Sequence, residues 1–171
     1  MAQSAIASST ASHHDTQGEA TSPRALHPIL ERARAQAASA GLSYAGGVTP
    51  NEAWELVSAG EAVLVDVRSG EERKFVGHVP ESVFVPWANG TALTRNPRFV
   101  RDLENKVGKE ATVLLLCRSG KRSAAAAEAA AKAGFQNVFN VLEGFEGDLD
   151  AQQRRGGFNG WRHAGLPWIQ D

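Results

Sequence analysis

Three short, mostly apolar runs constrain the fold more than any other feature of the sequence; they span 62–67, 112–116 and 137–142. Each run has the length of a strand, and segments with helix-forming character lie between them. Strands that are apolar on both faces are typical of parallel sheets, because helices cover both sides of such a sheet. The alternation therefore predicts an α/β fold, with a parallel sheet between two layers of helices.

Capping residues and glycines divide the rest of the chain into shorter elements. Thr49 precedes Pro50 and Glu52, and Ser69 precedes Glu72, which are patterns that begin helices. We expect helices at 25–40, 50–59, 70–75, 97–107, 123–133 and 159–164. We also expect two further strands at 44–48 and 82–85.

The length of 171 residues fits one domain with additional chain at the N-terminus. Residues 1–24 are rich in Ser, Ala and Thr, lack the apolar centre of a secretory signal and offer few core residues, so we expect a disordered tail. The Ser content also fits a transit peptide, but Asp15, Glu19 and the late first arginine, Arg24, argue against one. We expect an N-terminal helix over 25–41 and a single domain over 42–171.

Charge and cysteine content exclude several kinds of function. The formal net charge is −1 at pH 7, so we expect neither a nucleic acid nor a membrane partner. No run reaches the roughly 18 apolar residues that a transmembrane helix needs. A single cysteine cannot form an internal disulfide, which favours a reducing compartment such as the cytoplasm. No ligand spacing for a metal is present, and we expect no metal and no cofactor.

The single cysteine, Cys117, stands where the predicted strand at 112–116 ends and a loop opens the next helix. Ligands of parallel sheets bind at this carboxyl edge. The helix N-terminus and the loop cations favour an anion, and we expect them to stabilise a thiolate. Gly120 allows the loop amides to converge on an anion. A buried structural cysteine is the alternative, but it would need neither the cations nor the glycine.

The sequence CRSGKRS at 117–123 resembles the active-site loop of rhodanese-type sulfurtransferases. Further motifs resemble the same family, namely LVDVR at 64–68, GHVP at 77–80, VFVP at 83–86, LEG at 142–144 and GLP at 165–167. Together they cover about 49–168, and the tail before residue 25 lies outside them. Several motifs in order are a more specific signal than one cysteine loop.

The resemblance implies a three-layer α/β/α fold with a central, parallel, five-stranded sheet. It implies that Cys117 attacks the outer sulfur of thiosulfate or a similar anionic donor and carries that sulfur as a persulfide. Cyanide, a small thiol or a protein thiol would then accept the sulfur, and the oligomeric state stays open. The loop cations would attract the donor and the loop amides would hold the sulfur, so the expected substrate-binding residues are Arg118, Ser119, Gly120, Lys121, Arg122 and Ser123.

Two other functions are compatible with such a loop. Cell-cycle control phosphatases and related arsenate reductases are similar in fold, but their loop has five residues between the cysteine and the arginine. Here four residues separate Cys117 from Arg122, and no second cysteine is present to resolve an arsenate reductase intermediate. The other alternative is a module that binds or relays sulfur without turnover.

Three features outside the loop also carry expectations. We expect Asp66 and Arg68 to form a structural ion pair. Phe145 stands where the family often has a second glycine, and we expect it to narrow the rim of the pocket. We expect the acidic residues within 143–150 to lie in a solvated loop, because they lack the spacing of a calcium loop.

Overall fold

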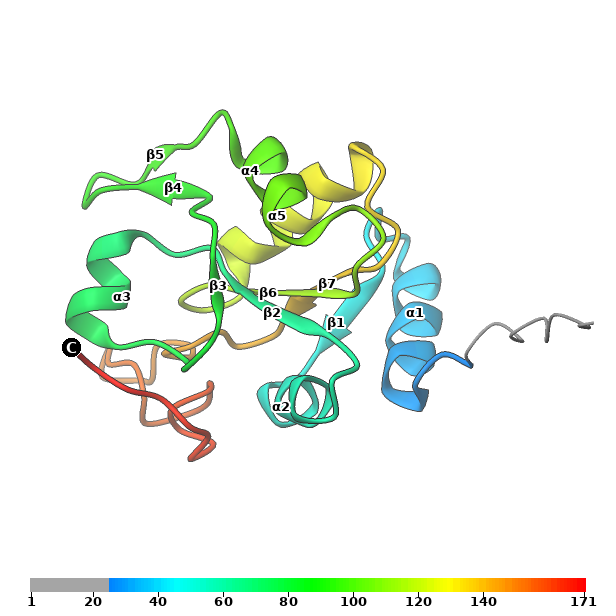
Figure 1. Ribbon diagram of the computed structural model, residues 1–171. Helices are drawn as coiled ribbons and strands as arrows, with labels where there is room; N and C mark the ends of the chain where they lie inside the picture. The colour runs from blue at the N-terminus through cyan, green and yellow to red at the C-terminus, as the bar shows by residue number, and fades with distance from the viewer. Residues whose placement is uncertain (1–24) are drawn as a thin grey trace, which may run out of the picture.

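The computed structural model describes residues 25–171 (Figure 1). The tail expected at 1–24 lies outside the described residues. Along the described part the helices are α1 Pro28–Ala40, α2 Pro50–Ser58, α3 Gly70–Val76, α4 Phe99–Val107 and α5 Lys121–Lys132. The strands are β1 Gly46–Val48, β2 Val63–Asp66, β3 Val83–Phe84, β4 Ala88–Asn89, β5 Thr94–Arg95, β6 Val113–Leu116 and β7 Val138–Val141. No helix within 25–171 is long and apolar enough to cross a membrane.

Parallel pairing joins β1, β7, β6, β2 and β3, in that order, into a five-stranded sheet. The register places Leu114 of β6 between Leu64 of β2 and Phe139 of β7. Figure 1 shows α4 and α5 on one side of this sheet, with α1 and α2 on the other. The predicted three-layer α/β/α fold is confirmed.

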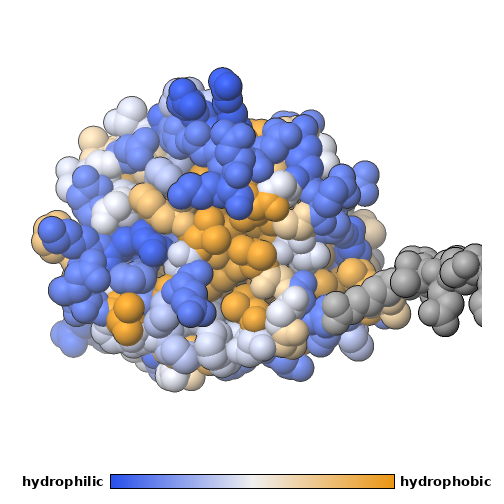
Figure 2. Space-filling model, viewed as in Figure 1, coloured by the Kyte–Doolittle hydropathy of each residue, from blue (hydrophilic) through white to orange (hydrophobic). Residues whose placement is uncertain are grey.

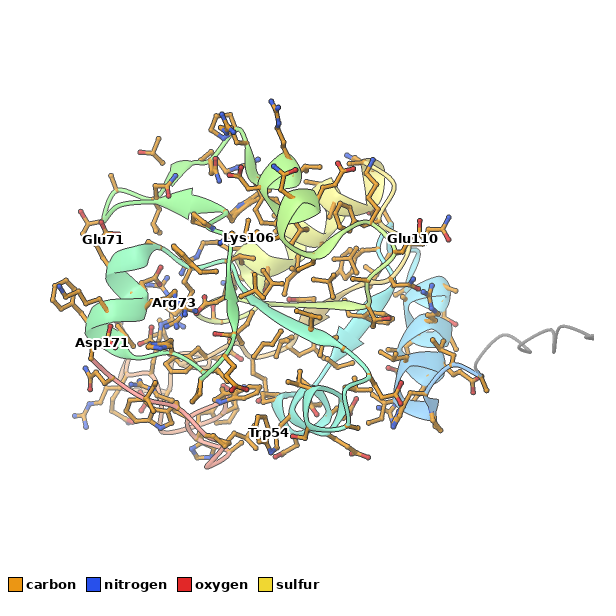
Figure 3. The ribbon with its side chains drawn as sticks, viewed as in Figure 1. Trp54, Glu71, Arg73, Lys106, Glu110 and Asp171 are labelled. Carbon is orange, nitrogen blue, oxygen red and sulfur yellow. The ribbon has the colours of Figure 1, made fainter. Side chains whose placement is uncertain are left out.

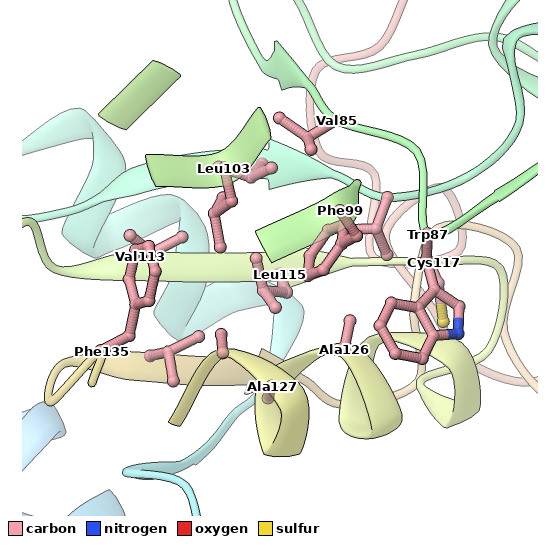
Figure 4. Packing of buried hydrophobic residues seen from close by; sticks show 14 of the residues in the cluster. Val85, Trp87, Phe99, Leu103, Val113, Leu115, Cys117, Ala126, Ala127 and Phe135 are labelled. Atoms are coloured by element: carbon pink, nitrogen blue, oxygen red, sulfur yellow. The ribbon is translucent and has the colours of Figure 1, made fainter. Parts of the chain in front are cut away.

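Alternate side chains of each strand face opposite helical layers. The odd-numbered residues of β6 pack with α4 and α5, and the even-numbered ones pack with α1 and α2. Figure 4 shows the first layer, in which Phe99 and Leu103 of α4 and Ala126 of α5 lie around Leu115. All four residues of β6 are 0% exposed, as its wholly apolar sequence predicts for a central parallel strand.

Two helices begin at the caps that the sequence predicts, and one begins earlier. The Thr49 hydroxyl accepts a hydrogen bond from the Glu52 N–H at the start of α2. Ser69 and Glu72 form a reciprocal capping box at the start of α3. α5 begins at Lys121 instead of the predicted residue 123, with Gly120 as its N-cap. The cations that follow Gly120 therefore belong to the first helical turn.

Two regions differ from the prediction. β4 and β5 pair as a short antiparallel hairpin, which the sequence analysis missed because two-residue strands leave no periodicity to detect. The sequence signal that does indicate this hairpin is the dipeptide Asn89-Gly90, which is typical of turns between antiparallel strands. The helix predicted at 159–164 is wrong: the segment forms turns, and the Trp161 N–H donates to the Gly144 carbonyl instead.

One edge of the sheet is formed by β3, a strand of two residues that pairs with Val65 and Asp66 of β2. Figure 2 shows apolar side chains gathered over this part of the surface. A pocket of about 420 Å³ lies between α2 and this edge, and its lining includes Trp54, Val57, Leu64, Val79 and Pro80. Its lining contains no residue of 117–123, so the pocket lies apart from the cysteine loop.

A substitution at Gly46 of β1 tests how closely the backbone of α1 approaches this strand. The φ of Gly46 is 144°, and a Cβ there would lie 2.4 Å from the Ala33 carbonyl oxygen. Gly60 also has a positive φ, 70°, but a Cβ there would meet nothing within 4 Å. Because strain and a backbone clash add, we expect Gly46→Ala to lower the free energy of unfolding by more than about 2 kcal/mol. We expect the control, Gly60→Ala, to cost about 1 kcal/mol, from the left-handed backbone alone. Urea denaturation measures both, and equal losses would contradict the close contact.

Candidate active site

Residues 117–120 connect β6 tightly to α5 at the carboxyl edge of the sheet, and residues 121–123 belong to the first turn of α5. Gly120 has a φ of 94°, a backbone conformation that glycine adopts without strain. A Cβ at this position would lie 3.4 Å from the Glu143 backbone nitrogen. The loop therefore lies in van der Waals contact with the chain that follows β7, and it is the positive φ that favours glycine at position 120.

The segment after β7 holds the loop through backbone hydrogen bonds. The Phe145 N–H donates to the Cys117 carbonyl (2.8 Å), and the Glu146 N–H donates to the Arg118 carbonyl (3.0 Å). Gly144 packs directly on this backbone, since a Cβ there would lie 2.5 Å from the Arg118 carbonyl carbon. The motifs at 117–123 and 142–144 thus form one structural unit.

Cys117 is 1% exposed, and its Sγ lies within hydrogen-bond distance of two donor groups. The Gly120 N–H donates to Sγ at 3.1 Å, and the Ser123 hydroxyl oxygen lies 3.1 Å from the same atom. Trp87 belongs to the same buried cluster, and Figure 4 shows its indole beside the sulfur. Donors placed at a sulfur stabilise negative charge on it, so these surroundings suit a thiolate nucleophile.

Asn140 of β7 connects the two groups that contact Cys117 Sγ. Its Oδ1 accepts a hydrogen bond from the Ser123 hydroxyl (2.5 Å), and its Nδ2 donates to the Gly120 carbonyl (3.1 Å). The sequence analysis missed this residue. Its signal is a single polar side chain in a strand whose other residues are apolar and buried.

Arg122, in the first turn of α5, forms a bidentate ion pair with Glu72 of α3. The distances are 2.8 Å from Nη1 to Oε2 and 2.7 Å from Nη2 to Oε1. Burial by itself would raise the pKa of Glu72, but hydrogen bonds from Arg122 and Ser69 outweigh burial and lower that pKa from 4.5 to about 2. The hydrogen bond with Glu72 raises the pKa of Arg122. The loop sequence predicts that Arg122 attracts an anionic donor, whereas in the structure Glu72 neutralises the charge of Arg122.

Arg118 and Lys121 are the loop cations that have no carboxylate partner among residues 25–171. Lys121 is exposed, and Arg118 is partly buried with an Nε that has no hydrogen-bond partner among the described residues. Ser119, between the cysteine and Gly120, is also partly buried. The uncompensated positive charge of the loop therefore comes from Arg118 and Lys121.

A pocket of about 270 Å³ borders the loop beside Arg118. Its other walls come from α3 and from the β4–β5 hairpin, through Ser69, Glu71, Glu72, Val76, Gly90, Thr91 and Leu93. The lining therefore combines apolar side chains with carboxylates and a guanidinium group. Such a mixture suits a small organic molecule that carries charge.

Asp66 and Arg68 form the predicted structural ion pair, and both side chains are 0% exposed. Arg68 Nη2 lies 2.8 Å from Asp66 Oδ2, and Arg73 Nη1 lies 3.0 Å from the same oxygen. Figure 3 shows Arg73 reaching from α3 toward the sheet. The Arg68 guanidinium also lies 4.2 Å from the centre of the Phe145 ring. Phe145 is 0% exposed, so the prediction that it narrows the pocket rim is wrong: the ring packs in the core.

The acidic segment at 143–150 makes hydrogen bonds to the chain near residue 160. The Gly160 N–H donates to Glu143 Oε2 (3.0 Å), and Asn159 Nδ2 donates to Asp148 Oδ2 (2.9 Å). The acidic side chains of this segment are partly buried, so the prediction of a solvated loop is wrong. Within 25–171, no group of three or more His, Cys, Asp or Glu side chains is arranged to hold a metal ion.

The Glu72–Arg122 pair makes folding stability depend on pH. The pKa of Glu72 is about 2 in the folded protein against an ordinary 4.5, so folding favours the ionised form. This contribution is complete above pH 4.5 and is lost as the pH falls toward 2. We expect Glu72 to account for up to about 3 kcal/mol of lost stability across this window.

Urea denaturation at several pH values measures this contribution. In Glu72→Gln we expect a flatter dependence between pH 4.5 and 2. Glu104→Gln, in the exposed pair with Lys109, is the control and should keep the slope of the wild type. An unchanged slope in Glu72→Gln would contradict the assignment.

Comparison with known proteins identifies the family. The family described as Rhodanese-like domain matches residues 49–151. The thiosulfate sulfurtransferase GlpE of Actinobacillus pleuropneumoniae serotype 5b (strain L20) is 31% identical over 120 residues, which cover 70% of this chain and 89% of that relative. The crystal structure of Rv0390 from M. tuberculosis is 47% identical with a TM-score of 0.68, and the match covers 75% of this chain and 99% of that chain. The chain therefore belongs to the rhodanese-like domain family.

Proposed function

We propose that this protein is a sulfurtransferase that moves a sulfane sulfur from thiosulfate or a similar anionic donor to a thiophilic acceptor. The transferred sulfur is carried as a persulfide on Cys117. The main support is the position of Cys117 Sγ at the carboxyl edge of the sheet, where the Gly120 N–H and the Ser123 hydroxyl contact it. Family membership and the GlpE relative support sulfurtransferase activity in general.

The reaction consists of two displacement steps. The Cys117 thiolate attacks the outer sulfur of thiosulfate; a new S–S bond forms, the S–S bond of the donor breaks, and sulfite leaves with the bonding electron pair. The protein now holds a persulfide anion. Cyanide or a thiolate then attacks the outer sulfur, and the Cys117 thiolate leaves with its electron pair. The cycle consumes no oxidant and no reductant.

The charges around the loop favour an anionic donor. Arg118 and Lys121 have no carboxylate partner in the described part of the chain, and α5 begins at the loop with its unpaired amides. Thiosulfate carries two negative charges, so this field raises its local concentration. The phosphatase alternative has five residues between the cysteine and the loop arginine, whereas here four residues separate Cys117 from Arg122.

The acceptor has to come from outside the chain, because Cys117 is its single cysteine. The pocket beside Arg118 has a volume of about 270 Å³, which is that of about nine water molecules. This is more than cyanide needs and admits an organic thiol or a cysteine-bearing segment of a protein. A reducing compartment such as the cytoplasm would supply such thiols.

Intact mass spectrometry tests the first step directly. We expect thiosulfate to add one sulfur atom to the protein, because the Cys117 thiolate captures the outer sulfur. Cys117→Ser should gain no sulfur, since a serine hydroxyl is not ionised at neutral pH and has no sulfur to form a persulfide. Absence of an adduct in the wild type, or an adduct on Cys117→Ser, would contradict the proposal.

Steady-state assays then separate turnover from a sulfur carrier. With thiosulfate and cyanide, an enzyme releases thiocyanate continuously with ping-pong kinetics. A carrier forms the persulfide without continuous thiocyanate release. Hydrolysis of an aryl phosphate that depends on Cys117 would instead support the phosphatase alternative.

A substitution at Lys121 tests how much the charge of the loop contributes to the reaction with the anionic sulfur donor. We expect Lys121→Gln to reduce the rate constant of persulfide formation from thiosulfate by up to about tenfold at low ionic strength. High salt should remove the difference, because it screens an exposed charge. Lys132→Gln changes the same residue type at the far end of α5 and should leave the rate unchanged. Equal effects of the two variants would contradict a local role.

A further inference from the structure

Asn140 occupies a position where core packing alone would favour an apolar side chain. Its neighbours in β7 are apolar and buried, and Asn140 itself is 4% exposed. It shares a sheet face with Val138, which packs in the same cluster as Cys117. Burial of an amide is costly unless both of its polar atoms are hydrogen-bonded. Both polar atoms of the Asn140 amide are hydrogen-bonded, and their partners belong to Ser123 and Gly120, the two residues that contact Cys117 Sγ.

The hydrogen bond to Gly120 fixes the orientation of the Asn140 amide. A backbone carbonyl only accepts, so the atom 3.1 Å from it must be the donor Nδ2. Oδ1 then faces Ser123, and the 2.5 Å between Ser123 Oγ and Oδ1 requires a proton between the two oxygens. An amide oxygen carries no proton. The proton must therefore be that of the Ser123 hydroxyl.

Ser123 thus has one hydroxyl proton and two partners for it. Its Oγ lies 3.1 Å from Cys117 Sγ and 2.5 Å from Asn140 Oδ1. While the proton points to Asn140, Ser123 Oγ can only accept a hydrogen bond from a Cys117 S–H. To donate to a thiolate, the hydroxyl has to turn away from Asn140 and leave Oδ1 without this partner. The two orientations of the hydroxyl match the two protonation states of the sulfur.

We propose that Asn140 is a positioning residue that sets the balance between thiol and thiolate at Cys117 by competing with the sulfur for the Ser123 proton. Its Nδ2 also anchors Gly120, whose N–H contacts Sγ whichever way the hydroxyl points. After sulfur transfer, the negative charge moves to the outer sulfur of the persulfide, and the Ser123 proton returns to Asn140. The inference rests on the proposed function only in that Cys117 is the reacting group.

Several charged groups also lie around Cys117, and the test leaves them unchanged. On the side of the loop they are Arg118, followed by Lys121 and Arg122 of α5. The neighbouring elements contribute Glu72 and Arg73 of α3, Asp66 of β2, Arg68 after β2, Arg95 of β5 and Glu143 after β7. Because none of them is substituted, a change at Asn140 is measured against a constant electrostatic background.

Two substitutions should act in opposite directions on the pH midpoint of Cys117 alkylation by iodoacetamide. Asn140→Leu removes the competing acceptor and frees the Ser123 proton for the thiolate, so we expect the midpoint to fall by about one pH unit. Asn140→Asp keeps an acceptor and adds negative charge, so we expect the midpoint to rise by about one unit or more. Because the chain has one cysteine, the alkylation rate reports this sulfur alone.

Ser123→Ala tests whether the effect passes through the hydroxyl. In this background we expect Asn140→Leu no longer to lower the midpoint, because no hydroxyl proton is left to compete for, and the lost hydrogen bond from Nδ2 to Gly120 acts only in the opposite direction. Asn105→Leu, at an exposed position of α4, is the control for the same chemical change and should have no effect. Circular dichroism and thermal unfolding check that the variants fold. Where Asn140→Leu fails to fold, Asn140→Ala replaces it with the same expected sign.

Three results would overturn the proposal: shifts in the same direction for Asn140→Leu and Asn140→Asp, no shift for either, or an equal Asn140→Leu shift in the Ser123→Ala background. A merely structural role would move both variants the same way. Alkylation needs no sulfur donor. A protein that forms no persulfide would therefore contradict the proposed function, while the alkylation result would still decide the role of Asn140.

Discussion

Parallel pairing of β6 with β7 is the constraint on which the rest of the site depends. The register sets Leu115 opposite Asn140, so β7 ends beside the cysteine loop and the chain continues across it. The Phe145 N–H then binds the Cys117 carbonyl, while Gly144 allows the two backbones to touch. The shape of the loop is therefore set by a neighbouring strand and the segment after it, in addition to its own glycine.

Ion pairing decides which cations act on this loop. The charge of Arg122 is neutralised by the ion pair with Glu72, and this pair connects α5 to α3 across the carboxyl edge of the sheet. Because Glu72 also lines the pocket beside Arg118, the pair shapes that pocket as well. Within residues 25–171, the loop cations without a carboxylate partner are Arg118 and Lys121. A basic sequence motif thus overstates the positive field that the folded protein presents.

Local signals explain what the sequence could predict. Apolar runs identify β2, β6 and β7, and the capping residues at 49 and 69 locate two helices, because each signal lies within a few neighbouring residues. The Cys117 loop was found for the same reason. Asn140, the pairing of Arg122 and the direction of the Phe145 ring depend on contacts between elements that are far apart in sequence. The β4–β5 hairpin is too short to produce a period.

Burial of the nucleophile restricts the chemistry that the site can perform. Cys117 is 1% exposed, so a reagent that reaches Sγ must be small, as thiosulfate is. A protein disulfide would have to bring two bulky chains to the same atom, and the chain has no second cysteine to resolve the mixed disulfide. Once a sulfur is transferred, it lies about 2 Å beyond Sγ. The acceptor then needs to reach only this outer atom. The proposed persulfide chemistry is thus compatible with the burial of Cys117 in a way that disulfide exchange is not.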